Sequence, residues 1–307
     1  MIYRQVFAKE NATEIWETFL AQLKTDNLHW LIFTILFIPL NWAFETFKWQ
    51  ALIKNFEYLS FGKCYQAILA GITLSLFTPN RIGEYGGRIL LVKPENNWKG
   101  VIATLVGSFS QLLVLMSFGI LGSLYFVHHF FEIDTWIWMS MLFLGLFFSG
   151  LMLFCFYNID LIVPIAKRIP YIHKLKRFVK HVKVLKNYSS KTLSIALFFA
   201  FARYLTYSLQ YFFMLQFFGI KVSIISGIAG IATIFLFQTS VPLPPVMGLF
   251  VRGKIALDIW GLFSENELGI LASTFSLWIL NLIVPALIGM IFIIKINVVK
   301  SLGIEEK

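Results

Sequence analysis

Five stretches of this 307-residue sequence are each at least 20 residues long and carry few charges. A helix needs about 20 apolar residues to cross the hydrocarbon core of a bilayer. The five stretches are residues 30–49, 101–127, 136–157, 193–218 and 270–294. Charged residues make up 14% of the chain, against about 25% in a soluble domain. We therefore predict an all-α, polytopic integral membrane protein, with one domain over residues 1–307.

Two further apolar stretches, residues 64–92 and 222–263, are interrupted by residues that end helices. The interrupting residues are Pro79 and Gly83 in the first stretch and Pro244, Pro245 and Gly248 in the second. Proline removes a backbone donor and glycine relaxes φ, and backbone freed at membrane depth needs partners from protein or water. We predict two re-entrant helical hairpins and about seven membrane segments in total. Residues 222–241 are also long enough to cross the membrane completely, and that alternative stays open.

A basic segment sets the predicted orientation. Residues 158–191 hold nine Lys or Arg and one acid, which is most of the net charge of +10. Such segments stay in the cytoplasm. With both hairpins re-entrant, the N-terminus is then outside and the C-terminus inside. Residues 29–127 and 192–297 become two repeats of opposite topology, joined by the span at 135–157, as in many transporters.

Two amphipathic segments are predicted to lie on membrane surfaces. The outer segment, residues 1–28, contains a short amphipathic helix at residues 12–23. The basic segment 158–191 carries an apolar stripe through Ile172 and Val179, which favours contact with the anionic cytoplasmic leaflet over a solvated topology signal. Because the positive charge is gathered in this one segment, we expect an anionic membrane surface as its partner and no nucleic acid.

The first break carries the charged residues that most resemble a binding site. Arg81 and Arg88 suit bidentate phosphate contacts, and Asn80 adjoins them. A helix that restarts after Gly83 would also present free N–H groups to an anion. Glu84 lies three residues after Arg81 and four before Arg88, so on a helix it can pair with either. We expect a lipid headgroup site here; the alternative is a solvated cytoplasmic loop.

The second break has a similar pattern. Arg252 is the candidate headgroup contact, because Lys254 and Asp258 are spaced to neutralise each other as an i,i+4 pair. The alternative is an outer hairpin whose basic side chains reach water. Three more charged residues lie within or at the end of spans and are candidates for support or coupling: Arg203, Glu45 and Lys48. For the last two, the alternative is that they only mark the inner interface.

Motifs for other chemistries are missing from the sequence. The five histidines have no acid or cysteine at ligand spacing, so we expect no metal site and no cofactor. The sequence contains no nucleophile elbow, zinc-protease helix or P-loop, and we assign no catalytic residue.

Three motifs resemble the membrane domain of lysylphosphatidylglycerol synthases, also called the flippase-like domain. Residues 41–49 resemble the end of the family's first span, where a basic residue precedes Trp. Pro79 to Glu84, followed by Arg88, resembles the family's Pro-x-Arg-x-Gly-Glu motif. Residues 242–253 resemble its late Pro/Gly-rich motif, but they lack the Glu that many members carry after the late glycine.

The resemblance implies lipid handling in the bacterial cytoplasmic membrane, namely translocation of aminoacyl-phosphatidylglycerol or another anionic phospholipid between leaflets. The two-domain relatives carry a soluble transferase domain, whereas the longest stretch outside the predicted spans here has 34 residues. We therefore expect a phospholipid translocase and not an enzyme. Two alternatives stay open. One is an intramembrane enzyme in which Glu84 acts as acid or base and Arg81 and Arg88 hold a lipid-linked phosphate; the other is a non-catalytic membrane partner protein.

Overall fold

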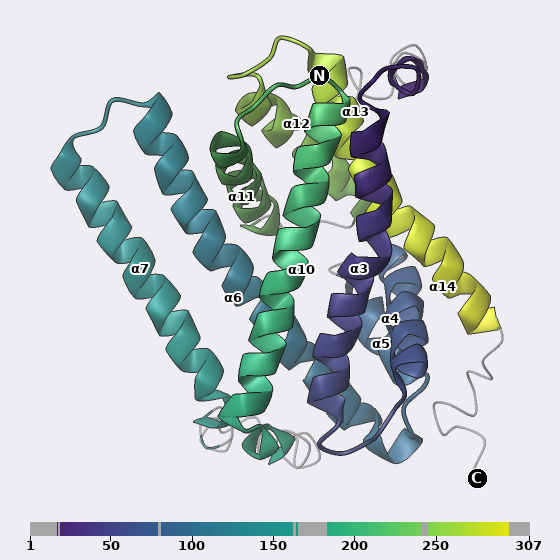
Figure 1. The fold of residues 1–307 in the computed structure, drawn as a ribbon. Coiled ribbons are helices and arrows are strands. Elements are labelled where there is room, and N and C mark those ends of the chain that lie inside the picture. Colours follow the sequence, from purple (N-terminus) through teal and green to yellow (C-terminus); the bar gives the residue numbers. More distant parts are fainter. Residues whose placement is uncertain are drawn as a thin grey trace. The chain divides into compact units, whose positions relative to one another are not determined.

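The computed structural model describes residues 17, 19–78, 81–161, 164, 183–240 and 245–294, and every regular element within them is helical (Figure 1). The first half of the chain contributes α3 (Leu28–Ile53), α4 (Phe61–Leu76), α5 (Gly83–Ile89), η2 (Pro94–Asn96), α6 (Asn97–Phe130) and α7 (Thr135–Tyr157). The second half contributes η3 (Ile159–Leu161), η5 (Lys183–Asn187), α10 (Ser190–Phe217), α11 (Ile224–Ser240), α12 (Pro245–Trp260), α13 (Glu267–Trp278), the π-helical turn η6 (Ile279–Ile283) and α14 (Val284–Ile294).

Five helices of the described chain are long and apolar enough to cross a membrane, judged by length and composition. They are Leu28–Ile53, Pro94–Phe130, Thr135–Tyr157, Ser190–Phe217 and Glu267–Ile294. Each overlaps one of the five uninterrupted spans almost completely, which confirms the predicted all-α membrane fold. The total of about seven membrane segments stays a prediction, because it depends on how the two interrupted stretches meet the bilayer.

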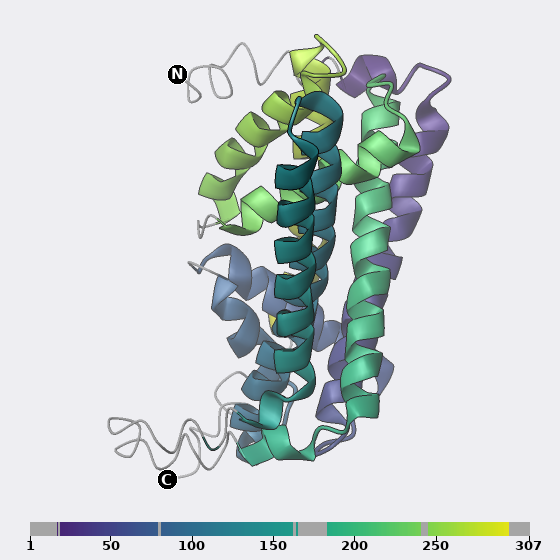
Figure 2. The same cartoon turned by 90° about the vertical axis from the view of Figure 1, so that its left-hand side faces the viewer.

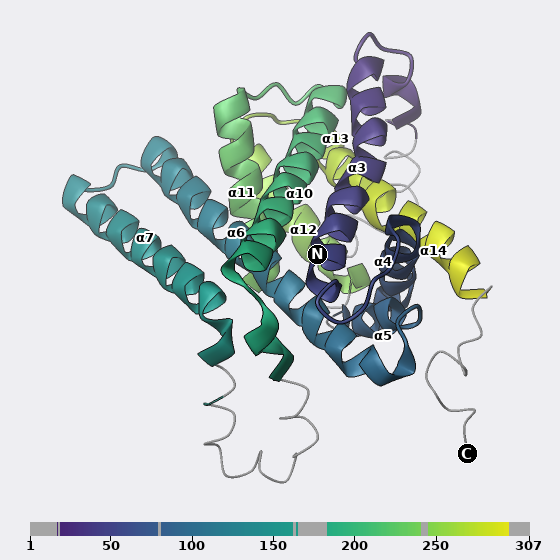
Figure 3. The ribbon, with the colours of Figure 1, turned by 60° about the horizontal axis from the view of Figure 1, so that its bottom comes forward.

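Both interrupted stretches fold as helical hairpins. In the first, α4 and α5 lie side by side and antiparallel (Figures 1 and 3): a Cβ on Gly87 would lie 2.5 Å from the Cα of Gly71. In the second, α11 ends at Ser240 and α12 begins at Pro245, and Gly230 of α11 faces the Trp260 ring of α12. The predicted second break reached Gly248, but α12 already includes it, because proline is well tolerated in the first turn of a helix.

Packing divides the chain into two units. The first unit comprises Met1–Asn41, Leu115–Leu146 and Tyr204–Val284, and the second comprises Trp42–Val114, Phe147–Arg203 and Pro285–Lys307. The first helical hairpin belongs to the second unit and the second hairpin to the first unit. The predicted repeats, residues 29–127 and 192–297, are not tested by this division.

The first unit has an aromatic core with internal hydrogen bonds. Trp260 is completely buried, and its Nε1 donates to the hydroxyl of Tyr211 at 3.2 Å. That hydroxyl also bonds the hydroxyl of Thr274 at 2.7 Å, which joins α12, α10 and α13. The joined ends of α6 and α7 run antiparallel (Figures 1 and 3), and the Trp138 indole donates to the Leu124 carbonyl.

The second unit packs through glycines that let helices approach closely. A Cβ on Gly289 of α14 would lie 2.2 Å from the Leu69 carbonyl of α4, and Thr73 of α4 donates to the Ala286 carbonyl at 2.7 Å. Small residues at such crossings are typical of membrane helices. The C-terminal part of α3 runs beside the N-terminal part of α10 (Figures 1 and 2), with Phe47 and Phe199 stacked between them.

Several predictions lie outside the described residues or are only partly covered. Of the outer segment 1–28, only residue 17 and residues 19–28 are described. The amphipathic stripe from Ile172 to Val182 and the C-terminal residues 300–307 lie outside the described chain.

Candidate functional site

A buried carboxylate, Glu45, joins three elements of the second unit. Its Oε2 accepts from Lys48 Nζ at 2.7 Å and from Arg203 Nη1 at 2.8 Å, while its Oε1 accepts from Arg88 Nη2 at 2.8 Å. Lys48 is on α3 with Glu45, Arg88 is on α5 and Arg203 is on α10. The exposed fractions of Glu45, Lys48 and Arg88 are 3%, 1% and 2%, so these charges are almost completely removed from solvent.

Glu84 extends this arrangement towards the surface of the unit. One of its carboxylate oxygens contacts Arg88 one turn later, and the other lies 3.6 Å from Nε of Arg81 one turn earlier. Exposure rises along the series, from 2% for Arg88 to 18% for Glu84 and 45% for Arg81. Arg81 is also the one non-glycine residue of the described chain with a positive φ, at 58°. We call Glu45, Lys48, Arg81, Glu84, Arg88 and Arg203 the charged network.

Two neutral residues complete the contacts of the charged network. Gln111 of α6 presents its Oε1 to Lys48 Nζ at 3.4 Å and to Arg203 Nη1 at 3.5 Å. Trp42 of α3 lies under the Arg203 guanidinium at 4.9 Å, within the range of a cation–π interaction. Neither Gln111 nor Trp42 is among the site residues predicted from the sequence. Trp42 lies three residues before Glu45 on the same helix face, and this spacing is a signal that could have identified it.

The charged network carries more positive than negative charge. Among the described residues, four cations share two carboxylates, which leaves a surplus of two positive charges. In addition, Nε of Arg88 is buried and has no hydrogen-bond partner among the residues that the structure describes. Buried charges are expensive unless they are paired, so a surplus of this kind favours an anion as a further partner.

The first hairpin positions Arg88 through three glycines. A Cβ on Gly71 would lie 2.9 Å from the Glu84 carbonyl and 3.1 Å from Cγ of Arg88, so only glycine leaves room for these residues. A Cβ on Gly83 would lie 2.3 Å from the Leu74 carbonyl, where the chain turns back. With Gly87 facing Gly71, α5 is held directly against α4, and Arg88 points into the unit instead of into water.

The start of α5 is less open than the sequence predicts. The N–H of Gly83 donates to Oγ1 of Thr78 at 2.7 Å, and the N–H of Tyr85 donates to the Ile82 carbonyl. The expected row of free N–H groups is therefore wrong at these two positions, because a local hydroxyl and a local carbonyl already accept. Pro79 and Asn80, the other predicted members of the break, lie outside the described residues.

The second break belongs to the first unit. Lys254 and Asp258 contact each other as predicted, and both are more than half exposed. Arg252 is half-buried on the same helix, α12. Gly248 lies in that helix with open space at its Cβ position, Pro245 begins it, and Pro244 lies outside the described residues.

A metal site is not formed by the described part of the chain, which holds no group of three or more His, Cys, Asp or Glu side chains placed to bind an ion. The charged network itself offers cationic side chains that can bind an anion. Guanidinium and ammonium groups bind phosphate and carboxylate, and Arg does so with a planar pair of donors.

Comparison with known proteins identifies one family. The family model described as Lysylphosphatidylglycerol synthase TM region matches residues 12–253, which include every member of the charged network. No curated protein and no solved structure matches the chain.

Proposed function

This chain belongs to the lysylphosphatidylglycerol synthase TM region family, and from that premise we propose that it translocates an anionic phospholipid between membrane leaflets. The family and the five apolar helices make it a multi-pass membrane protein with a lipid-related function. The proposal that the lipid is anionic and is translocated depends on one observation, the surplus of positive charge in the charged network. Ionisable groups inside a membrane domain are rare, and they commonly mark substrate pathways.

We infer that the phosphate of the lipid headgroup supplies the missing negative charge. Arg81 is the most exposed member of the charged network and would bind the phosphate first. The phosphate would compete with the Glu84 carboxylate for the Arg81 guanidinium. Arg88 offers a buried Nε donor deeper in the unit. The cations of the charged network are paired and become less exposed from Arg81 to Arg88. A lipid phosphate could therefore replace the carboxylate partner of one cation and then of the next, and each charge would keep a partner during translocation.

Translocation is favoured over lipid chemistry by the state of the two carboxylates. Glu45 contacts three cations and Glu84 contacts two, so neither acid is placed as a free proton donor or acceptor. A general acid or base must be able to exchange a proton with its substrate, whereas here cations already contact both carboxylates. We therefore propose transport as the activity and assign no catalytic residue.

Reconstitution in lipid vesicles tests the proposal. Purified protein is inserted into vesicles that contain fluorescent phosphatidylglycerol or phosphatidylcholine, and a membrane-impermeant quencher reports the lipid that reaches the outer leaflet. We expect exchange of phosphatidylglycerol to be faster than that of phosphatidylcholine and to be lost in Arg81→Ala and Glu84→Gln. Lys93→Gln removes an exposed charge just after α5, outside the charged network, and should exchange lipid at the parent rate. Parent rates in correctly folded Arg81→Ala, Glu84→Gln and Arg88→Ala would contradict the proposal.

A further inference from the structure

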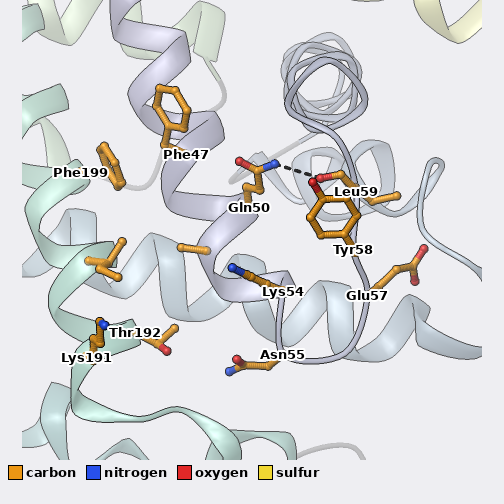
Figure 4. Close-up of a pocket in the computed structure, with 12 residues that line it drawn as sticks. Phe47, Gln50, Lys54, Asn55, Glu57, Tyr58, Leu59, Lys191, Thr192 and Phe199 are labelled. Carbon is orange, nitrogen blue, oxygen red and sulfur yellow. Dashed lines mark hydrogen bonds between the residues drawn. The ribbon is translucent and has the colours of Figure 1, made fainter.

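A cavity of about 490 Å³ lies in the second unit, between the end of α3, the loop that follows it and the start of α10 (Figure 4). Ligand sites in proteins commonly enclose about 300–1,000 Å³. Its apolar wall includes Phe47, Ala51, Ile195 and Phe199, and its polar lining includes Lys54 and Lys191. None of these residues belongs to the charged network. We call it the interfacial cavity.

The apolar wall is built by two stacked rings. Phe47 of α3 and Phe199 of α10 have centroids 5.3 Å apart and an interplanar angle of 24°, and Figure 4 shows them together at one end of the cavity. Phe47 is 39% exposed although it is apolar. An exposed aromatic wall beside charged groups matches a ligand with one apolar and one polar part.

The polar lining offers two lysines whose charges are not neutralised by the one acid nearby. Lys54 and Lys191 are both exposed, and neither forms an ion pair within the described chain. Glu57 also lines the cavity, but its carboxylate accepts from the Lys93 N–H at 3.1 Å and from Asn96 Nδ2 at 2.9 Å. In Figure 4 that carboxylate points away from Lys54. The cavity therefore presents positive charge.

Local hydrogen bonds fix the frame that carries the lysines. Gln50 Nε2 donates to the Leu59 carbonyl at 2.9 Å and closes the loop after α3, as Figure 4 shows. Asn55 Nδ2 donates to the Asn187 carbonyl at 3.2 Å, which ties this loop to the segment before α10. The two lysines thus belong to one bonded surface and not to independent ends of helices.

We propose that the interfacial cavity binds an anionic phospholipid, with Lys54 and Lys191 on the phosphate and the Phe47–Phe199 wall against the first acyl methylenes. A phospholipid combines the negative charge and the apolar chain that the two halves of the cavity match. The predicted topology puts this end of α3 and α10 in the cytoplasmic leaflet, where anionic lipids attract lysine side chains. The site is separate from the charged network, so it does not depend on the proposed translocation.

Lipid binding to the full chain in detergent tests this site without any transport step. Native mass spectrometry would follow titrations with phosphatidylglycerol, with phosphatidylcholine of the same acyl chains, and with soluble glycerol phosphate. We expect the double variant Lys54→Gln/Lys191→Gln to weaken phosphatidylglycerol binding by about fivefold for each lysine. The matched control Lys63→Gln/Lys186→Gln removes two exposed lysines that do not line the cavity, and should bind like the parent.

The outcomes separate this site from its alternatives. Equal loss in both double variants would show diffuse surface attraction and overturn the proposal, as would parent affinity in Lys54→Gln/Lys191→Gln. Displacement of phosphatidylglycerol by equimolar glycerol phosphate would show a free-phosphate site and overturn the lipid assignment. Repeating the titration in Arg81→Ala removes the most exposed cation of the charged network. Binding that still depends on Lys54 and Lys191 in that variant supports the interfacial cavity whether or not translocation is found.

Discussion

Arg88 Nη2 lies 2.8 Å from Glu45 Oε1, and this contact joins α3 to a seven-residue helix that begins 38 positions after Glu45 in the printed sequence. Both side chains are buried. A helix of seven residues has little stability of its own, because the first turn is costly to form. The ion pair and the glycine contacts with α4 therefore hold α5 in place, so the element that carries Arg88 and the charged network depend on each other.

Removing the central carboxylate should destabilise the protein strongly. Glu45→Gln leaves Lys48, Arg88 and Arg203 without their shared counter-ion, and breaking a buried pair costs about 3–5 kcal/mol. We expect a clear fall in the thermal unfolding midpoint of the purified protein in detergent. Glu95→Gln, an exposed acid of the same unit, should change the free energy of unfolding by less than about 0.5 kcal/mol. Equal midpoints for the two variants would show that the buried charges are not coupled.

The shape of the Arg81 side chain should matter as well as its charge. Arg81→Lys keeps the charge but loses the planar pair of donors, so we expect lipid exchange between that of the parent and that of Arg81→Ala. Since Arg81 is 45% exposed, both variants should keep the parent unfolding midpoint. Exchange rates in vesicles at equal protein content provide the measurement. A full parent rate in Arg81→Lys would reduce the role of this residue to its charge alone.

Two neighbouring glycines of α5 should respond in opposite ways to alanine. A Cβ at position 87 would lie 2.5 Å from backbone atoms of Gly71, so Gly87→Ala must separate α5 from α4, with an expected loss of about 1–3 kcal/mol. Gly86 has nothing within 4 Å of its Cβ position, and Gly86→Ala should be neutral or stabilise the helix by up to about 1 kcal/mol. Thermal unfolding of both variants checks the hairpin packing; a neutral Gly87→Ala would contradict it.

Orientation can be measured by cysteine labelling in whole cells. On a background without Cys64 and Cys155, we expect a cysteine at Lys186 to react only after permeabilisation and a cysteine at Glu132 to react from outside. Both positions are exposed in the structure. Labelling of the Lys186 position in intact cells would overturn the predicted topology and would move the interfacial cavity to the outer leaflet.

Local sequence signals predicted the elements well. In the described chain, helices end at Leu76 and Ser240, shortly before the prolines of the two breaks, since the effect of proline on the backbone needs no distant partner. The pairing of Glu84 with Arg81 and Arg88 followed from helical spacing in the same way. The prediction that the second break extends to Gly248 is wrong, because α12 begins at Pro245 and proline can begin a helix as well as end one.

Distant contacts could not be read from the sequence. Glu45 and Arg203 are 158 positions apart, and only the packing of α3 against α10 brings them together. At the end of an apolar span, Glu45 and Lys48 resemble interface markers, and nothing local reveals that their exposed fractions are only 3% and 1%. The interfacial cavity has the same origin, since tertiary structure alone places Lys54 and Lys191 in the lining of one cavity.

The positive φ of Arg81 lowers the stability of the first hairpin. A side chain with a φ of 58° is crowded against its own carbonyl, which costs about 1–2 kcal/mol that glycine would not incur. A sequence optimised only for the free energy of unfolding would therefore have glycine at position 81. Arginine at this position lowers the free energy of unfolding but keeps a cation at the surface of the second unit, so maximal stability and a positive charge exclude each other at position 81.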